Sequence, residues 1–413
     1  MDKLNSRQRL LRAIAHQDVD YIPCSFMSFS ILRNRHRQDL FEAALAELEM
    51  GLDPMLFIPT LSRWQRRDHP DLRGLPVRFH PDVKTRTWRD GDLLTGRLFK
   101  EYETPAGKLS TSVRLSSDWP HGEFIPFIDD YQIPRADKPL VTSPSDLEAL
   151  QYLLIPPKEA DVNAFGVEAS IARSFVDQNG VLLAGGWGVG MDMANWLCGM
   201  ENLMILMHEQ PQFVSQVLEI IHQWNMQRME IVLSADIDLY IRRAWYEGCD
   251  FVIPKFFQHE VLPRLKAEAA LAHERGVKFG YICSSGTKPM LDFYNETGID
   301  VLIGIDPIQG TYTAMPLMKA KIGERVCLWG GVSAAVTVER GSEAEIRTAV
   351  RHALETLGPE GMILSPVDNF TVDEPSTWNN IDIFIDEWKA QREFHIANSR
   401  SLAKGLNPDR PRI

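Results

Sequence analysis

Acidic and aromatic residues recur in this 413-residue chain directly after short runs of apolar and β-branched residues. The side chains best suited to chemistry at these positions are Trp187, Trp245, Tyr246, Glu247, Tyr281, Cys283, Asp306, Gln309, Trp329, Ser333, Asp368 and Asn369. Carboxylates can donate protons, accept them or bind metals, and aromatic walls suit a flat or methylated organic substrate. We therefore expect catalytic roles for Glu247, Tyr281, Asp306 and Asp368, and substrate contacts from the rest of this set except Cys283.

Each of these residues also has a purely structural interpretation. The tryptophans can pack beneath a neighbouring segment, Glu247 can cap the following helix or pair with an arginine, and Cys283 can be a small buried strand-end residue. Asp306 can cap the helix after it, and Asp368 can cap a turn. Asp368 and Asn369, in a Ser-Pro-Val-Asp-Asn sequence, are the strongest candidates for the site.

The apolar runs alternate with segments of helical period, which predicts βα units and a parallel sheet. The expected strands are 21–26, 54–58, 181–186, 239–245, 278–283, 301–306, 326–331 and 362–366. The expected helices include 34–50, 211–234, 256–275, 286–297, 312–322, 342–358 and 375–393. Eight such units fit a closed (β/α)8 TIM barrel, whose active site lies at the carboxyl ends of the strands. The glycine-rich stretch 185–193 matches no dinucleotide-binding motif, which disfavours a doubly wound sheet.

Residues 76–135 interrupt this alternation. Asp90-Gly91 and Pro105-Ala106-Gly107 lie between alternating polar and apolar residues, as in β-hairpins. We expect a β-meander inserted after the second strand and covering one end of a single barrel domain over residues 1–413. A separate small domain is the alternative.

Composition excludes several classes of protein. With 44% hydrophobic and 24% charged residues the chain is typical of a globular protein. The net charge of −12 and the lack of a long basic run argue against nucleic-acid binding. Five scattered cysteines without a CxxC pair indicate a reducing compartment. The charged N-terminus and the absence of a run of about 18 apolar residues predict a cytoplasmic protein without membrane contact.

Two parts of the sequence resemble the uroporphyrinogen decarboxylase superfamily. The first is Ser6-Arg7-Gln8-Arg9, followed by an amphipathic segment and Asp18-Val19-Asp20-Tyr21-Ile22-Pro23. The second runs from Trp245 through the last expected helix and matches the superfamily in order and spacing. The resemblance implies a TIM barrel, and either decarboxylation of uroporphyrinogen without a cofactor or zinc-dependent methyl transfer involving a corrinoid or a thiol.

The decarboxylases of this superfamily carry an arginine-rich loop after the first strand, which grips substrate carboxylates. The corresponding loop here contains Arg33, Arg35 and Arg37 without that motif. Their spacing prevents all three from sharing one helical face. They either form a solvated helix start or include one or two contacts to an anionic substrate.

The methyltransferases of the superfamily bind zinc through a His-x-Cys sequence and a second cysteine at the last strand. Here these positions read Tyr281-Ile282-Cys283 and Asp368. Zinc accepts carboxylate oxygen, so Cys283, Asp368 and Glu247, together with Asp306, can be proposed as a mixed site.

Three hypotheses follow from the resemblance. The first is transfer of a methyl group from a small methylated or methoxylated compound to a corrinoid-binding partner protein, with possible zinc involvement. The second is decarboxylation of uroporphyrinogen or another aromatic acid, and the third is a silent ligand-binding barrel. Superfamily members are often dimers, so a homodimer is a further expectation.

Overall fold

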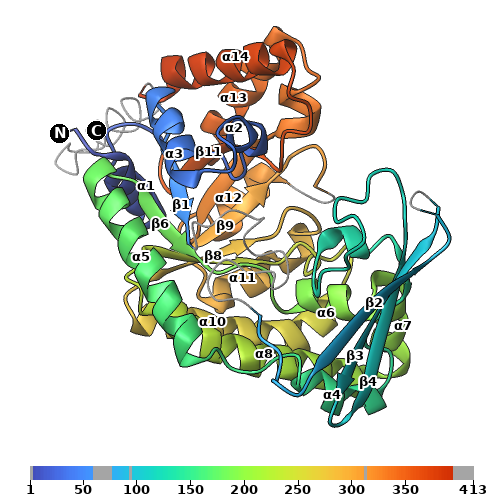
Figure 1. Cartoon of the computed structure of the whole chain (residues 1–413). Helices are drawn as coiled ribbons and strands as arrows, with labels where there is room; N and C mark the ends of the chain where they lie inside the picture. Colours follow the sequence, from blue (N-terminus) through green and yellow to red (C-terminus); the bar gives the residue numbers. More distant parts are fainter. Residues whose placement is uncertain (1–2, 59–76, 93–94, 311–313, 394–413) are drawn as a thin grey trace, which may run out of the picture.

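A parallel sheet of seven strands forms the centre of the protein, in a computed structural model that describes residues 3–58, 77–92, 95–310 and 314–393 (Figure 1). Its order is β1-β6-β7-β8-β9-β10-β11, with every neighbouring pair parallel. The strands are β1 (Met55–Phe57), β6 (Leu182–Gly185), β7 (Leu239–Arg243), β8 (Lys278–Ile282), β9 (Val301–Ile305), β10 (Cys327–Ser333) and β11 (Met362–Val367). Seven of the eight predicted strands are therefore present, as expected for apolar runs buried on both faces of a sheet.

The remaining predicted strand, at residues 21–26, lies between the two edges of this sheet. Cys24 makes one parallel bridge to Leu364 of β11, and the Leu364 N–H donates to the carbonyl of Pro23. On the other side, the Asp53 N–H, just before β1, donates to the Cys24 carbonyl at 2.8 Å. The sheet is thus curled like a TIM barrel, with both edges bonded to one extended segment.

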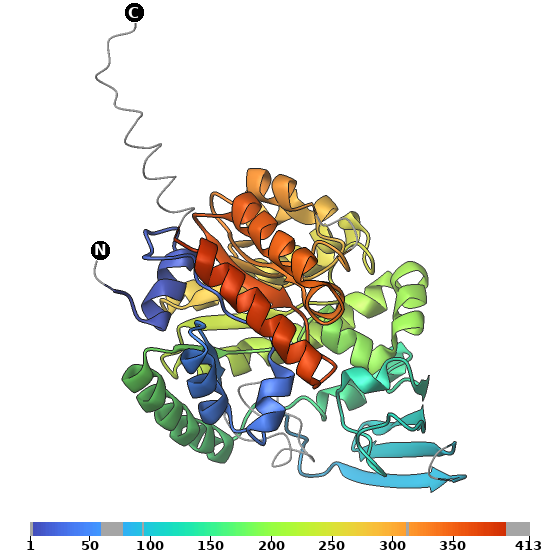
Figure 2. The ribbon, with the colours of Figure 1, turned by 90° about the horizontal axis from the view of Figure 1, so that it is seen from above.

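Helices cover the outer face of the curled sheet (Figure 2). The helices of the described residues, not all of which pack on this sheet, are α1 (Ser6–Ile14), α2 (Ser30–Arg35), α3 (Leu40–Glu49), α4 (Leu147–Gln151), α5 (Glu159–Asn179), α6 (Met191–Cys198), α7 (Met200–Glu209), α8 (Pro211–Leu233), α9 (Pro254–Phe256), α10 (Leu262–Glu274), α11 (Leu291–Thr297), α12 (Met315–Ile322), α13 (Glu343–Leu357) and α14 (Pro375–Gln391). Within the described part of the chain, none of these helices combines the length and the apolar character needed to cross a membrane.

The predicted helix 34–50 is wrong in one respect, because the chain forms two helices there. Arg37 and Gln38 adopt positive φ angles of 52° and 66°, which no helix accommodates. Asp39 then caps α3 by accepting from the N–H groups of Phe41 and Glu42. The beginning of the predicted helix 312–322 lies outside the described residues.

A second, antiparallel sheet lies in the chain between β1 and β6. Its strands are β2 (Lys84–Asp90), β3 (Arg97–Thr104), β4 (Gly107–Arg114) and β5 (Ala136–Lys138), paired in sequential order. Both predicted turns fall at strand ends, between β2 and β3 and between β3 and β4. Figures 1 and 2 show this sheet projecting from one side of the helix-covered body. It has a small core of its own, formed by Leu98, Val113, Leu115, Trp119 and Ile125.

Candidate functional site

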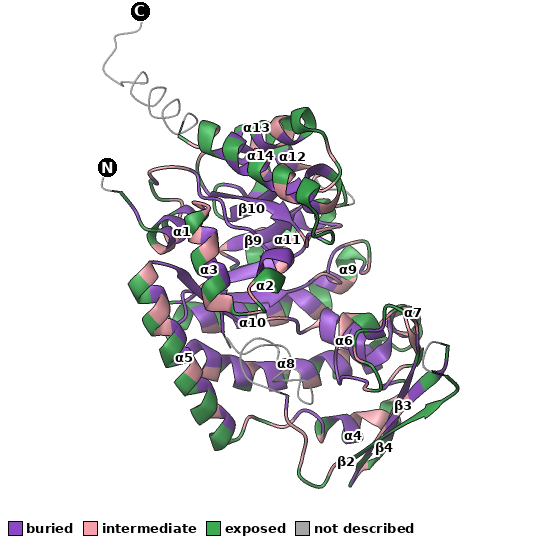
Figure 3. Ribbon diagram, turned by 45° about the horizontal axis from the view of Figure 1, so that its top comes forward, coloured by how far each residue is buried: buried purple, intermediate pink, exposed green. Residues whose placement is uncertain are grey.

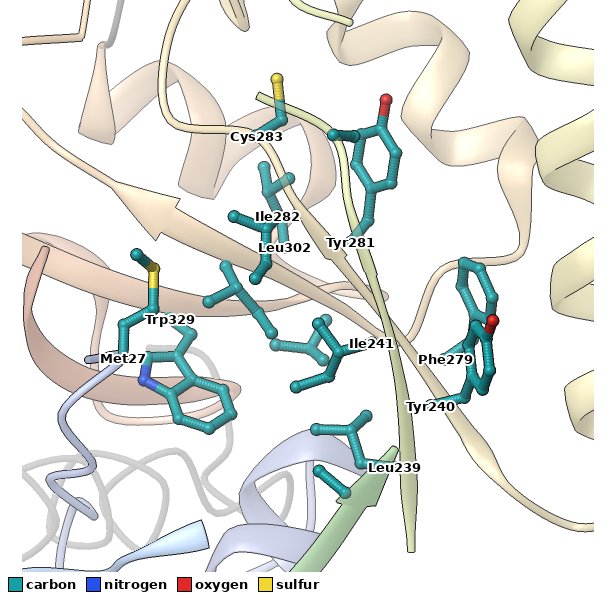
Figure 4. Close-up of a cluster of buried hydrophobic side chains, with 14 of the residues drawn as sticks. Met27, Leu239, Tyr240, Ile241, Phe279, Tyr281, Ile282, Cys283, Leu302 and Trp329 are labelled. Atoms are coloured by element: carbon teal, nitrogen blue, oxygen red, sulfur yellow. The ribbon is translucent and has the colours of Figure 1, made fainter. Parts of the chain in front are cut away.

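The two-residue period of the strands separates the candidate residues into two groups. Figure 4 shows Leu239 and Ile241 of β7 on the side of Trp329, whereas Tyr240 lies on the other side with Phe279. Because side chains alternate along a strand, Arg242 shares the helix side with Tyr240, and Arg243 shares the inner side with Ile241. Adjacent arginines of one strand therefore belong to different sites.

Arg242, Glu247, Glu268 and Tyr281 form the first group, which we call the helix-side cluster. The Arg242 guanidinium binds Glu247 and lies 2.9 Å from Glu268 of α10, and all three side chains are at most 2% exposed. The Tyr281 hydroxyl donates to Glu247 at 2.6 Å. Burial raises the pKa of Tyr281 well above its ordinary value, so its hydroxyl stays protonated. The cluster is a closed set of opposite charges.

The start of α6 completes this cluster. The backbone N–H of Met191 donates to Glu247 at 3.1 Å. Gly190, directly before it, has a φ of 58°, and a Cβ there would collide with the Arg242 and Glu247 side chains. Glycine is therefore required for this close approach of α6.

Cys283 lies beside the helix-side cluster but is poorly suited to bind a metal. Its thiol is buried and contacts the Ser285 carbonyl at 3.5 Å, and burial raises its pKa to about 12. Glu247 already accepts from three donors, and no group of three or more metal-ligating side chains occurs among the described residues. The structure does not bring Cys283, Glu247 and Asp368 together, so these residues do not fit the predicted zinc site.

Arg243 is the centre of the second group, the strand-end group, which also contains Asp130, Asp192, Asp306 and Asp368. Its guanidinium is 1% exposed and lies 2.8 Å from Asp130 and 3.3 Å from Asp192. Asp192 also accepts from the Tyr246 N–H at 3.1 Å. Burial raises the pKa of Asp192 to about 7, against the opposing effect of the Arg243 charge.

Three tryptophans surround the Arg243 guanidinium. The ring centres of Trp245, Trp196 and Trp187 lie 4.0, 5.2 and 5.9 Å from it. Trp196 also donates from its indole N–H to Asp130 at 2.9 Å. The indole N–H of Trp245 is buried without a hydrogen-bond acceptor. Two of the predicted aromatic residues, Trp187 and Trp245, therefore do lie at this site.

Asp306 and Asp368 lie after β9 and β11. Asp306 is 2% exposed, and one of its oxygens accepts from the N–H groups of Ile308 and Gln309 at 2.8 Å. Its other oxygen is buried without a donor. Burial and the nearby Asp306 charge raise the pKa of Asp368, which is half-buried. The raised pKa increases the share of Asp368 that carries a proton at a given pH, and that form can act as a general acid.

The remaining predicted residues occupy varied positions. Asn369 accepts from the Ser28 hydroxyl and donates its N–H to Asp368, whereas Ser333 caps the turn after β10. Gln309 is exposed, and Tyr246 packs against Phe251. Trp329 is fully buried and donates to the Ser25 carbonyl at 2.8 Å, beside Met27 in Figure 4. Trp329 belongs to the packed interior of the curled sheet, because its register places it below the strand ends.

Sequence analysis did not select Arg242, Arg243, Asp130 or Asp192. A signal for the first two was present, since two arginines within the apolar run 239–245 must be buried, and buried charges need partners. Asp130 carried no comparable signal. It lies 113 residues before Arg243, in the segment that follows the antiparallel sheet.

A curled parallel sheet with acidic and aromatic residues at its carboxyl ends is the architecture of TIM-barrel enzymes. The profile of the uroporphyrinogen decarboxylase (URO-D) family matches residues 125–390, and the chain belongs to this family. No curated protein matches the chain significantly.

One solved structure shows the same fold. A methyltransferase from Methanosarcina mazei aligns with a TM-score of 0.57 at 17% identity, over 94% of this chain and 99% of that one. A B12-independent methionine synthase from Shewanella sp. W3-18-1 has a TM-score of 0.37 at 12% identity, over 57% of this chain and 67% of its own. At these identities the first similarity concerns the fold alone, and the second carries no argument.

Proposed function

We propose that this protein transfers a methyl group from a small methylated or methoxylated compound to the corrinoid of a partner protein. The observation that carries the proposal is the pair Asp306 and Asp368 at the ends of β9 and β11, the two strands that flank β10, with a raised pKa on Asp368. We further propose that segment 21–26 serves as the eighth strand of a closed barrel. Membership of the URO-D family and the fold shared with a methyltransferase are consistent with this proposal.

The chemistry assigned to the acid pair is activation of the leaving group. The acceptor nucleophile attacks the methyl carbon, the bond from that carbon to the donor oxygen breaks, and the bonding electrons stay on oxygen. Protonated Asp368 gives its proton to this oxygen, so the demethylated product leaves as a neutral alcohol or phenol. Burial and the nearby Asp306 charge both raise the pKa of Asp368, which favours its protonated form.

The aromatic side chains of the strand-end group form the walls around the methyl-group donor. Trp187 and Trp245 are half-buried, so part of each ring is available to a flat substrate. The Arg243 guanidinium lies over these rings, and Asp130 and Asp192 balance its charge. In this proposal Arg243 orients the walls of the site, and the two acids after β9 and β11 act on the substrate.

Decarboxylation of a polycarboxylate has less support. Arg35 lies 2.7 Å from Asp373 and its guanidinium stacks 3.9 Å from the Trp378 ring. Arg33 lines a small cavity with Glu47 and residues of β1. Two of the three arginines expected to grip carboxylates, Arg33 and Arg35, therefore lie beside acidic residues of this chain.

The test uses the purified chain with free cob(I)alamin as acceptor and a panel of methoxylated aromatic acids, methanol and methylated amines as donors. Formation of methylcobalamin, followed by its absorbance change and dependent on one class of donor, supports the proposal. Its absence with every donor, together with release of CO2 from uroporphyrinogen or an aromatic acid, contradicts the proposal in favour of decarboxylation.

A further inference from the structure

The carboxylate of Asp306 is a buried group that this chain compensates only in part. Asp306 directly follows β9, and Figure 3 shows β9 and β10 buried along their length. Its side chain is 2% exposed, and one oxygen accepts from the Ile308 and Gln309 N–H groups. The other oxygen is buried without a donor. A buried carboxylate is costly unless a cation or further hydrogen-bond donors compensate it.

The strand-end group as a whole carries more negative than positive charge. Arg243 is its only basic member, and it binds Asp130 and Asp192. Within the described ranges of the chain, neither Asp306 nor Asp368 forms an ion pair. Protonation of Asp192 and Asp368 would still leave two carboxylates against one guanidinium, an excess of one negative charge. A site with such an excess attracts cations and repels carboxylates.

Asp368 connects Asp306 with the rest of this group. The charges of Asp306, Arg243 and Asp130 all act on the pKa of Asp368, so these side chains are neighbours. The Arg243 guanidinium in turn lies 4.0 Å from the ring centre of Trp245. The faces of tryptophan rings attract cations, and this ring already has one beside it. The surroundings of Asp306 therefore combine negative charge, a general acid and an aromatic wall.

We propose that the methyl donor carries a protonated amine, and that this ammonium group binds the free oxygen of Asp306. The proposal rests on the function proposed above and names the class of donor that the site selects. The ammonium group supplies both the missing hydrogen-bond donor and the missing positive charge. Asp368 then acts on the ether oxygen of the same molecule. Neutral methoxylated compounds lack the contact with Asp306, and anionic ones are also repelled.

The test uses three probes of similar shape and different charge. These are para-methoxybenzylamine, a cation at neutral pH, para-methoxybenzyl alcohol, which is neutral, and para-methoxybenzoate, an anion. Isothermal titration calorimetry measures their affinities for the parent chain. We expect the amine to bind about tenfold or more tightly than the alcohol, because a charged hydrogen bond forms in a buried site, and the benzoate to bind most weakly. Absence of amine binding, or an affinity no greater than that of the alcohol, contradicts the proposal.

Asp306→Asn tests the residue itself. Asparagine can still accept from the Ile308 and Gln309 N–H groups but carries no charge, so we expect this variant to bind amine and alcohol equally. Asp373→Asn, which removes an exposed carboxylate from the segment after β11, is the matched control and should keep the preference for the amine. Thermal unfolding shows that each variant is folded. An amine preference that survives in folded Asp306→Asn contradicts the proposal, and the three probes on the parent chain remain decisive if this variant does not fold.

Turnover separates this inference from the proposed function. Methylcobalamin formation from the alcohol or the benzoate as fast as from the amine contradicts the inference and supports methyl transfer. Conversely, a preference for the amine that depends on Asp306, without any methylcobalamin from it, contradicts methyl transfer and supports the cation site.

Discussion

The helix-side cluster and the strand-end group both combine arginine with carboxylates at β7, but they differ in how completely their polar atoms are bonded. Glu247 accepts from Arg242, Tyr281 and the Met191 N–H, and Glu268 accepts from Arg242. In the helix-side cluster only the Arg242 Nε lacks a hydrogen-bond partner, whereas in the strand-end group one oxygen of Asp306 and the indole N–H of Trp245 lack one. Buried polar groups are normally bonded. We therefore interpret the bonded carboxylates of the helix-side cluster as structural, and the Asp306 oxygen without a donor as a place for a ligand.

The largest expected effect tests the structural side of this comparison. Glu247→Ala leaves Arg242 buried beside one acid instead of two, and we expect a loss of about 3–5 kcal/mol in the free energy of unfolding. Urea unfolding measures it. Glu296→Ala, which removes an exposed pair with Lys266, is the control and should lose less than about 1 kcal/mol. Equal losses in both variants would mean that the cluster is not a structural unit.

The second prediction concerns the functional side. Asp368→Asn keeps the shape of the side chain, and asparagine tolerates the positive φ of 71° at this position. Without the proton donor, we expect methyl transfer to slow about 100-fold, with little change in unfolding. Single-turnover kinetics at neutral pH measure the rate, with Asp373→Asn in the following segment as the control. A rate that is unchanged in Asp368→Asn removes this residue from the mechanism.

Tyr281→Phe distinguishes the two groups more finely. It removes the hydroxyl bond to Glu247 and nothing else, so we expect a loss of about 2 kcal/mol in unfolding free energy. The methyl-transfer rate should stay the same, because Tyr281 lies on the helix side. Slower methyl transfer by Tyr281→Phe, with an unchanged free energy of unfolding, would instead support the catalytic role that the sequence predicts for Tyr281.

The smallest effect is a change in pH dependence. The Asp306 charge contributes to the raised pKa of Asp368, so Asp306→Asn should lower that pKa. An acid must be protonated to donate, and the rate therefore falls as pH rises through its pKa. In Asp306→Asn this fall should begin at lower pH, and the rate at pH 8 should be roughly three- to tenfold below that of the parent. A pH profile identical to that of the parent would show that the two acids do not interact.

Much of the fold was predictable because strands buried on both faces have continuous apolar runs. The runs at 239–245 and 278–283 correspond to β7 and β8 nearly residue for residue. The break between α2 and α3 was not predictable, since nothing in the helical period of 34–50 indicates the positive φ angles of Arg37 and Gln38.

The site was predictable only in part. We expected residues that directly follow a predicted strand to lie at the strand ends. The structure places Asp306, Asp368, Trp187 and Trp245 there. Sequence position alone did not decide which side of the sheet each residue faces, so Tyr281 was grouped with residues on the other side. The apolar run 326–331 ends close to Trp329, which predicts a residue at the carboxyl end of the strand. The strand β10 in fact continues to Ser333, so Trp329 lies within it.

The bonds of Asp130 have a consequence for how this protein can be divided. Asp130 follows the antiparallel sheet in the chain, yet it binds Arg243 of β7 and Trp196 of α6. Removing residues 77–138 as a block would leave a fully buried cation with half of its counter-charge. A chain shortened in this way must therefore replace the carboxylate of Asp130.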